Sequence, residues 1–369
     1  MAAVTDTEIL ACLRLYGIRG IGPYTANQLL ASFGSAAAFW QAGATAWQAQ
    51  EGIGPKLLQA LQQSSEEETE QLLQQCRSQR IRLLVRDDPQ YPESLRQIDD
   101  APLVLFAFGN LDVLQASRML AIVGARKASK EGRLICRRWS EYLSSQQVVT
   151  VSGMAYGIDA AVHGGAVAVQ APTVAVLGAG LLTLYPMQQQ QVRAIVGQGG
   201  CVLSEYLPEQ SARPEYFPQR NRIIAGLSAA TLVMEADVAS GSLITARHAL
   251  RYGREVFAVP GSVLNQNHAG CHQLIRDGAY LAESADDVMQ LMGWQSQAAR
   301  DDSLESTLAH CNDGEQAVIR ALQHDVLHVD QLAEACACTV PDLAALLLSL
   351  EMQSIIESLP GSRYTLRRH

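Results

Sequence analysis

The chain lacks the features that would mark it as a membrane, secreted or metal-binding protein. No apolar run in its 369 residues reaches the ~20 residues that a bilayer-spanning helix needs. The N-terminus has no basic flank before an apolar core, so we expect no signal peptide. The eight cysteines are scattered, the closest two being Cys336 and Cys338, and the paired C-x2-C spacing of zinc sites is absent. We therefore expect a cytoplasmic protein with reduced thiols and no metal ion.

The sequence also lacks the motifs of common nucleotide-using enzymes. It contains no P-loop, no G-x-G-x-x-G fingerprint and no G-x-S-x-G nucleophile elbow. Its composition is that of a globular protein, with 48% hydrophobic residues, 18% charged residues and a mean hydropathy of +0.02. A chain of 369 residues suggests two or three domains, each large enough to bury its own core.

The net charge of −9 conceals a basic middle. Residues 116–280 hold 15 Lys+Arg and 10 Asp+Glu, which gives +5. Subtraction from the totals of 28 and 37 leaves 13 basic and 27 acidic residues elsewhere, or −14. A basic middle between acidic ends favours a local anion site over a chain coated in positive charge. The alternative is an uneven distribution of surface charge without function.

Three domains and a linker are expected. Residues 1–80 read as short helices, with a G-I-G-P turn at 20–23 and again at 52–55, each before an apolar helical pattern. Such a repeat is typical of helix-hairpin-helix units, or of a tight turn with proline as the first helical residue. Residues 294–312 read as a polar linker. Residues 313–369 contain three short helical patterns and a hairpin, which together predict a winged helix.

Residues 81–293 alternate apolar runs with helical patterns. Strands are expected at 103–108, 119–124, 148–152, 173–178, 201–205, 230–235 and 255–260, and helices near 129–145, 157–170, 187–198, 241–252 and 271–278. This alternation predicts an α/β domain, a Rossmann-like doubly wound and mostly parallel sheet with helices on both faces. In such sheets, ligands bind at the carboxyl ends of the strands.

The first strand-to-helix turn has the character of a phosphate cradle. Gly124 permits close backbone approach, Arg126 and Lys127 add positive charge, and Ser129 can cap the next helix. An ordinary turn is the alternative interpretation. The same chemistry continues at other strand ends, in a set of small, hydroxyl, cationic and aromatic residues. These further candidates are Ser152, Gly153, Ala155, Gly180, Phe217, Arg220, Asn221, Arg222, Ser240, Gly241, Ser242 and Thr245.

The segment 217–222 carries the strongest signal in that set. Arginine binds phosphate through bidentate forks, and the face of Phe217 can stack on a base. A structural alternative exists for Arg220, which could pair with Glu205 or Glu235 inside the domain. The interpretation expects backbone amides and guanidinium groups to converge on one trough, and it would fail if Arg126, Phe217 and Arg222 lay on unrelated surfaces.

These stretches resemble the DNA-processing protein A family (DprA, also called Smf). The similarity is carried by residues 123–126, 152–159, 204–206, 217–228, 240–246 and 254–261, whose order and spacing span roughly 88–283. The resemblance implies a homodimer, formed through the Rossmann-like domain, that binds single-stranded DNA without a catalytic reaction or cofactor. It also implies that the chain protects incoming DNA and loads the RecA recombinase during natural transformation. The family's phosphate loop falls on Gly124, Ala125 and Arg126, and its stacking aromatic on Phe217.

The chain departs from the family pattern in three places. Tyr156 stands where the family usually has arginine, and His272 where it usually has asparagine. The expected third helix of the winged domain, 340–352, contains Asp342 and Glu351 but no lysine or arginine. Because groove binding needs phosphate neutralisation, we expect this domain to contact protein rather than DNA.

Two other functions remain open from the residues. A nucleotide hydrolase or transferase could use the same crevice, with Asp159, His163 and Glu235 as acid–base candidates. A scaffold that uses the acidic ends for partners would show no salt-sensitive DNA binding. Turnover of mononucleotides and a single-strand shift assay distinguish the three hypotheses.

Overall fold

The computed structural model describes residues 4–294, 311–322, 326–353, 355–359 and 361–366. These residues form two compact units, Met1–Val288 and Met289–His369. The first unit contains the helical N-terminal part and a large α/β part. The second contains a small three-helix module. The predicted linker 294–312 falls almost wholly on residues 295–310, outside the described residues.

The first unit begins with five helices. They are α1 (Asp6–Tyr16), α2 (Pro23–Phe33), α3 (Ala36–Gln48), α4 (Pro55–Gln62) and α5 (Glu66–Ser78). Both G-I-G-P turns start a helix, because Gly22 and Gly54 are N-caps and each following proline occupies the first helical position.

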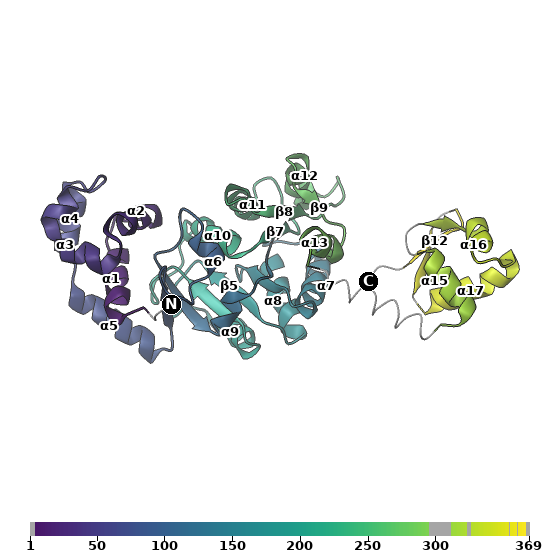
Figure 1. Cartoon of the computed structure of the whole chain (residues 1–369), viewed down its shortest axis with the longest axis horizontal. Coiled ribbons are helices and arrows are strands. Elements are labelled where there is room, and N and C mark those ends of the chain that lie inside the picture. Colours follow the sequence, from purple (N-terminus) through teal and green to yellow (C-terminus); the bar gives the residue numbers. More distant parts are fainter. Residues whose placement is uncertain (1–3, 295–310, 323–325, 354, 360, 367–369) are drawn as a thin grey trace. The chain divides into compact units, whose positions relative to one another are not determined.

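These N-terminal helices share a core with the sheet. Leu15 of α1 and Phe106 of the sheet belong to one buried apolar cluster. The Tyr16 hydroxyl donates to the Glu205 carbonyl oxygen at 2.6 Å, and the Asn27 amide donates to the Ala101 carbonyl oxygen at 3.1 Å. Figure 1 shows the five helices gathered at one end of this unit.

A nine-stranded sheet forms the centre of the first unit, in the order β1-β2-β6-β5-β4-β3-β7-β8-β9. The strands are β1 (Arg82–Val85), β2 (Val104–Gly109), β3 (Met119–Val123), β4 (Val149–Ser152), β5 (Thr173–Leu177), β6 (Cys201–Ser204), β7 (Ala230–Val233), β8 (Glu255–Ala258) and β9 (Tyr280–Leu281). Only the β1–β2 and β2–β6 pairings are antiparallel among these strands. The predicted mostly parallel α/β sheet is therefore confirmed, and the prediction missed the two short edge strands β1 and β9.

Helices cover both faces of this sheet. They are α6 (Glu93–Arg96), α7 (Lys130–Ser145), α8 (Ile158–Ala168), α9 (Pro186–Gly197), α10 (Tyr216–Leu227), α11 (Ser242–Arg251), α12 (Ala269–Arg276) and α13 (Ala285–Leu291), with short 3-10 turns at η1 (Asp112–Gln115) and η2 (Gln266–His268). Helix α10 is the one long helix of this part that the sequence patterns did not predict.

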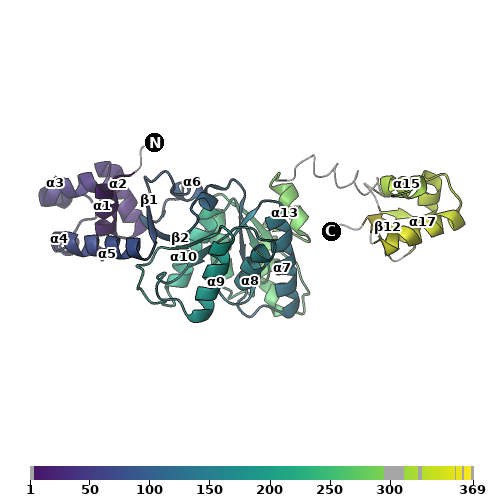
Figure 2. The same ribbon diagram turned by 90° about the horizontal axis from the view of Figure 1, so that it is seen from below.

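The direction of chain travel reverses at β3. From β3 the chain moves outward through β4, β5 and β6, and then returns to β7 on the other side of β3. Because crossovers between parallel strands are right-handed, α7 to α9 lie on one face and α10 to α12 on the other (Figures 1 and 2). The carboxyl ends of β3 and β7 therefore form the topological switch point, the place where open α/β sheets bind ligands.

The second unit is a small helical module with a three-stranded antiparallel sheet in the order β10-β12-β11. Its elements are α15 (Asp313–Ala321), β10 (Leu327–His328), α16 (Val329–Ala335), α17 (Val340–Met352), β11 (Ile356–Leu359) and β12 (Arg363–Leu366). Val318, Leu332 and Leu347 meet in its core. Within the described ranges no single helix is long and apolar enough to span a membrane, and α16 with α17 reach that length only as a pair bent by 102°.

Candidate nucleic-acid interface

A crevice of about 590 Å³ lies at the switch point. Its walls come from the end of β3 with the turn after it, the loop that follows β7, and the first turns of α10. Eleven of the sixteen predicted site residues line it. They are Gly124, Arg126, Lys127, Ala155, Phe217, Arg220, Asn221, Ser240, Gly241, Ser242 and Thr245.

The turn after β3 presents two exposed cations. Gly124 is required there, because an added Cβ would lie 2.6 Å from the Ile158 side chain and 3.0 Å from the Glu235 carbonyl oxygen. The Ala125 N–H donates to that same carbonyl at 2.7 Å and fixes the turn against β7. Arg126 and Lys127 are therefore held at the mouth of the crevice, where a phosphate can reach both.

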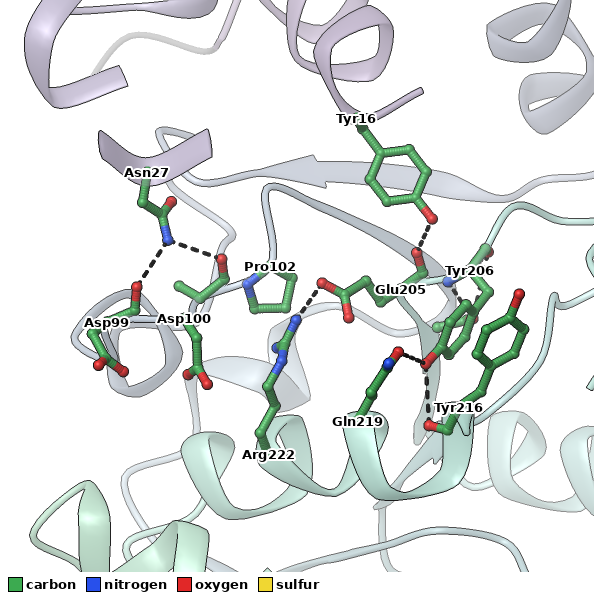
Figure 3. Close-up of polar contacts among 12 residues, drawn as sticks. Tyr16, Asn27, Asp99, Asp100, Pro102, Glu205, Tyr206, Tyr216, Gln219 and Arg222 are labelled. Atoms are coloured by element: carbon green, nitrogen blue, oxygen red, sulfur yellow. Dashed lines mark hydrogen bonds and ion pairs between the residues drawn. The ribbon is translucent and has the colours of Figure 1, made fainter. Parts of the chain in front are cut away.

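Phe217 lies directly beside the first of these cations. The guanidinium carbon of Arg126 is 4.8 Å from the centroid of the Phe217 ring. The start of α10 is held by Tyr216, whose ring stacks on Tyr206 with centroids 4.2 Å apart (Figure 3). A fixed aromatic face beside a fixed guanidinium is an arrangement that suits a base and its phosphate.

Arg220 lines the crevice as a buried side chain with 3% of its surface exposed. Its guanidinium donates to the Gly153 carbonyl oxygen at 2.7 Å and to the Val176 carbonyl oxygen. Burial lowers the pKa of Arg220 to about 10, and the nearby Asp159 carboxylate opposes this shift. Arg220 thus stays charged at neutral pH, joins α10 to the ends of β4 and β5, and adds positive potential to the crevice wall.

The loop after β7 supplies neutral donors and one acid. The Ser240 and Ser242 hydroxyls lie 2.7 Å apart at the start of α11, where the Leu243 N–H already donates to the Ser240 carbonyl oxygen. The Asn221 amide donates to the Gly241 carbonyl oxygen at 3.2 Å and closes this loop onto α10. Asp237 also lines the crevice, although its carboxylate accepts the Ala239 N–H at 2.8 Å.

The prediction for Arg222 is wrong. The side chain is buried and forms an ion pair with Glu205 (Figure 3), and it is not among the residues that line the crevice. Residues two apart in a helix do not share a face, so Arg220 and Arg222 cannot both point into one trough. The structural alternative, in which Arg220 pairs with Glu205 or Glu235, is wrong as well. Glu205 pairs with Arg222, and Glu235 accepts hydrogen bonds from Ser129.

Three more predicted residues are engaged elsewhere. The Ser129 hydroxyl caps α7 by accepting the Gly132 N–H at 2.8 Å, and it donates to Glu235 at 2.5 Å. The fully buried Ser152 hydroxyl donates to the Ile122 carbonyl oxygen at 2.7 Å. The Gly180 N–H donates to the Gln210 carbonyl oxygen at 2.7 Å. None of these residues lines the crevice, and Gly153 lines a neighbouring cavity instead.

The three acid–base candidates do not converge on one point in the crevice. Asp159 lines it, but Glu235 is 1% exposed and accepts hydrogen bonds from the Ser129 N–H and hydroxyl. His163 is buried with Nδ1 3.0 Å from the Thr173 hydroxyl, and burial lowers its pKa to about 3. In the part of the chain that the structure describes, no group of three or more His, Cys, Asp or Glu side chains is placed to hold a metal ion.

Sequence reasoning missed Asn267, which reaches the crevice from η2 beyond β8. Asn267 follows β8, and ligands bind at the carboxyl ends of such strands, so the same rule predicts that η2 can contribute to the site.

Comparison with known proteins identifies the family. Residues 82–293 match the family described as DNA recombination-mediator protein A, and residues 295–362 match the DprA winged helix domain. This chain belongs to the DprA/Smf family. The predicted resemblance and the predicted winged helix are therefore confirmed.

Relatives and solved structures agree with this assignment. Protein Smf of Synechocystis is 32% identical over 95% of this chain and 96% of its own length. The DNA processing protein DprA of Streptococcus pneumoniae is 44% identical over 55% of this chain and 71% of its own. The X-ray structure of that Streptococcus protein aligns with a TM-score of 0.67 at 33% identity, covering 78% of this chain and 98% of the other. A Helicobacter pylori DprA structure, described for its single-stranded DNA binding mode, aligns with a TM-score of 0.50 at 25% identity, covering 55% and 92%.

Proposed function

We propose that this chain binds single-stranded DNA in the switch-point crevice. Phosphates of the strand lie at Arg126 and Lys127, and one base stacks on Phe217. The observation that carries this proposal is the placement of the Arg126 guanidinium over the Phe217 ring at the mouth of the crevice. The single-stranded DNA binding described for the Helicobacter pylori relative supports it.

The proposal extends to the biological role that family membership suggests. The chain acts in the cytoplasm as a homodimer through its Rossmann-like domain, protects incoming single strands and loads RecA during natural transformation. It does this by binding and transfer, without turnover of the strand. The expected division into an N-terminal helical domain at 1–80, a DNA-binding domain at 81–293 and a winged helix at 313–369 is part of the proposal.

The chemistry of the crevice predicts how binding should behave. Cations and serine hydroxyls contact the sugar–phosphate chain, so affinity should fall as salt rises, with little dependence on sequence. Single strands should be preferred over duplex, because a stacked base must be unpaired to reach Phe217.

Fluorescence anisotropy with one labelled strand, alone and as a duplex, tests the proposal. The titration is repeated at about 50 and 200 mM salt, a range over which phosphate contacts lose much of their strength. We expect Arg126→Ala to weaken binding and to reduce the slope of log K against log salt by about 0.7, the value for one contact to a single strand.

The matched control is Arg77→Ala, since Arg77 is 55% exposed and pairs with Asp6 on the N-terminal helices. It removes the same charge and should leave the salt slope unchanged. Equal isotherms for Arg126→Ala and the wild type would refute the assigned site. RecA filament formation on a pre-bound strand tests the loading step, sedimentation tests the dimer, and a mononucleotide turnover assay tests the enzyme alternative.

A further inference from the structure

A second cavity adjoins the crevice and has a different chemical character. It encloses about 460 Å³, within the range of small-ligand pockets, and shares Arg126, Ala155 and Phe217 with the first crevice. Its floor is the carboxyl end of β5, at Leu177 and Gly178. Among its described lining residues Arg126, on the shared wall, is the only charged one.

Three large exposed side chains gather at this cavity. Tyr156 is 73% exposed, Tyr185 75% and Met187 60%, and all three line the cavity. Exposed apolar side chains scattered singly are ordinary, but a group of them in one hollow marks a binding surface. Two tyrosine rings offer flat faces of the kind on which bases stack.

The backbone holds Tyr156 outward. Met154, two residues earlier, is buried with a positive φ of 54°, and Gly157, one residue later, has a φ of 85°. The Ile158 N–H then donates to the Ala125 carbonyl oxygen at 3.3 Å, which joins this turn to the cation-bearing turn after β3. Non-glycine residues with positive φ cost energy and often occur at ligand sites.

Tyr185 is presented by the start of α9. Its N–H donates to the Gln188 side-chain oxygen at 3.2 Å, so the Gln188 side chain closes the helix start. The Gln188 oxygen is used in this bond, and Gln188 and Gln191 both line the cavity. Amide side chains can hydrogen-bond the edge of an unpaired base.

We propose that this cavity is a second base-binding subsite, in which an unpaired nucleobase stacks against Tyr156 and Tyr185. The inference rests on the proposed function, because the base belongs to the same strand whose phosphate lies at Arg126. Strands β3 and β5 are two inter-strand spacings apart, about 10 Å, so one strand crossing the carboxyl edge of the sheet meets both cavities. The Arg126 guanidinium and the Phe217 ring separate the two positions.

The test compares two oligonucleotides of equal length and charge, oligo-dT and an entirely abasic strand, by anisotropy at one salt concentration. For Tyr156→Ala/Tyr185→Ala we expect affinity for oligo-dT to fall about tenfold, the size of one lost base stack, with affinity for the abasic strand unchanged. Tyr156→Phe/Tyr185→Phe keeps both rings and should bind both strands like the wild type. Tyr24→Ala is the matched control, since Tyr24 is also exposed at 56% but lies in α2.

Photo-crosslinking of the unaltered protein provides a second readout. A strand carrying 5-iododeoxyuridine, irradiated and digested, should give adducts on peptides containing Tyr156 or Tyr185. An oligo-dT affinity within twofold of the wild type for the double alanine variant, or adducts on Phe217 alone, would overturn the subsite. Equal losses on both strands would also overturn it, because they would show that the tyrosines act on the backbone path or on folding.

These outcomes differ from failure of the proposed function. That failure would appear as a wild-type protein that binds neither strand, or as an Arg126→Ala variant that binds like the wild type, and the subsite would fall with it. If the wild type binds with a salt-sensitive affinity and Tyr156→Ala/Tyr185→Ala binds like it, the DNA site in the first crevice stands and only the second subsite is refuted.

Discussion

The ion pair between Arg222 and Glu205 yields the sharpest prediction about stability. Both side chains are nearly buried, with 8% and 11% of their surfaces exposed, and they join α10 to the end of β6. The Tyr16 hydroxyl on α1 donates to the backbone carbonyl of Glu205, so three segments meet at this point (Figure 3). Arg222→Met would leave a buried carboxylate without its partner, which costs about 3–5 kcal/mol.

Urea unfolding of four proteins measures this cost. They are the wild type, Arg222→Met, Glu205→Leu and the double variant, followed by tryptophan fluorescence. Trp40, Trp47 and Trp139 lie in the first unit and Trp294 in the second, so all four proteins carry Trp294→Phe and the fluorescence then reports the first unit alone. Each single variant should lose several kcal/mol, while the double variant should recover much of the loss, since a buried pair replaced by apolar groups is often nearly neutral.

The pH dependence of Arg222→Met follows from the same geometry. Burial raises the pKa of Glu205, and the Arg222 guanidinium opposes that rise. Without the guanidinium, the folded-state pKa of Glu205 stands further above its unfolded value of about 4.3. The variant therefore keeps its stability below about pH 4.3 and loses it as pH rises from there through the folded-state pKa. The difference in the free energy of unfolding between the wild type and Arg222→Met should thus be smaller near pH 4 than at pH 7. A gap below about 1 kcal/mol at pH 7, or a fall in DNA affinity with stability intact, would refute the structural assignment of Arg222.

Two other predictions concern the core and the crevice. Burial lowers the pKa of His163 to about 3. Its contribution to stability is therefore fully present above about pH 6.5 and is lost as pH falls towards 3, by at most about 1.4 kcal/mol per pH unit. The urea midpoint of His163→Leu should vary less with pH over this window than that of the wild type, and parallel curves for the two proteins would contradict the assignment. In Gly178→Ala the new Cβ would lie 2.9 Å from Cδ1 of Phe217, so the ring must shift. We expect anisotropy to show weaker single-strand binding, with a smaller loss of affinity than for Phe217→Ala and an unchanged melting temperature. An affinity equal to that of the wild type would count against base stacking on this ring.

Much of the fold could be predicted because its strands are covered on both faces. Strands β3, β5 and β7 consist of buried residues throughout, so they read in the sequence as short continuous apolar runs. The same signal fails for one edge strand. β9 has only two residues, both exposed, so it shows no apolar run. β1 has the same burial pattern as β8, which was predicted, so its apolar run was an available signal that the prediction missed.

The candidate site was predictable only where its residues follow strands. Gly124 ends a predicted strand, and Arg126 and Ser240 follow predicted strands within five residues. The carboxyl-end rule brings such turns together whatever the intervening sequence. The rule does not say which face of a following helix each side chain occupies. Segment 217–222 was treated as one cluster, but it lies in α10, where Phe217 and Arg220 are three apart and share a face while Arg222 is turned away. Ile223, Ile224 and Leu227, all buried, were the available signal that this segment is a helix.

This division of the arginines limits how many charges the crevice can offer a strand. Arg222 neutralises Glu205, and the Arg220 guanidinium donates hydrogen bonds to the carbonyl oxygens of Gly153 and Val176. Arg126 and Lys127 are left as the exposed cations of the described crevice. For contacts to a single strand the salt slope changes by about 0.7 per phosphate, so removal of both cations should lower it by about 1.4. A loss near 2.8 in Arg126→Ala/Lys127→Ala would mean that four charges act as one unit, and the separation of structural from binding arginines would then be wrong.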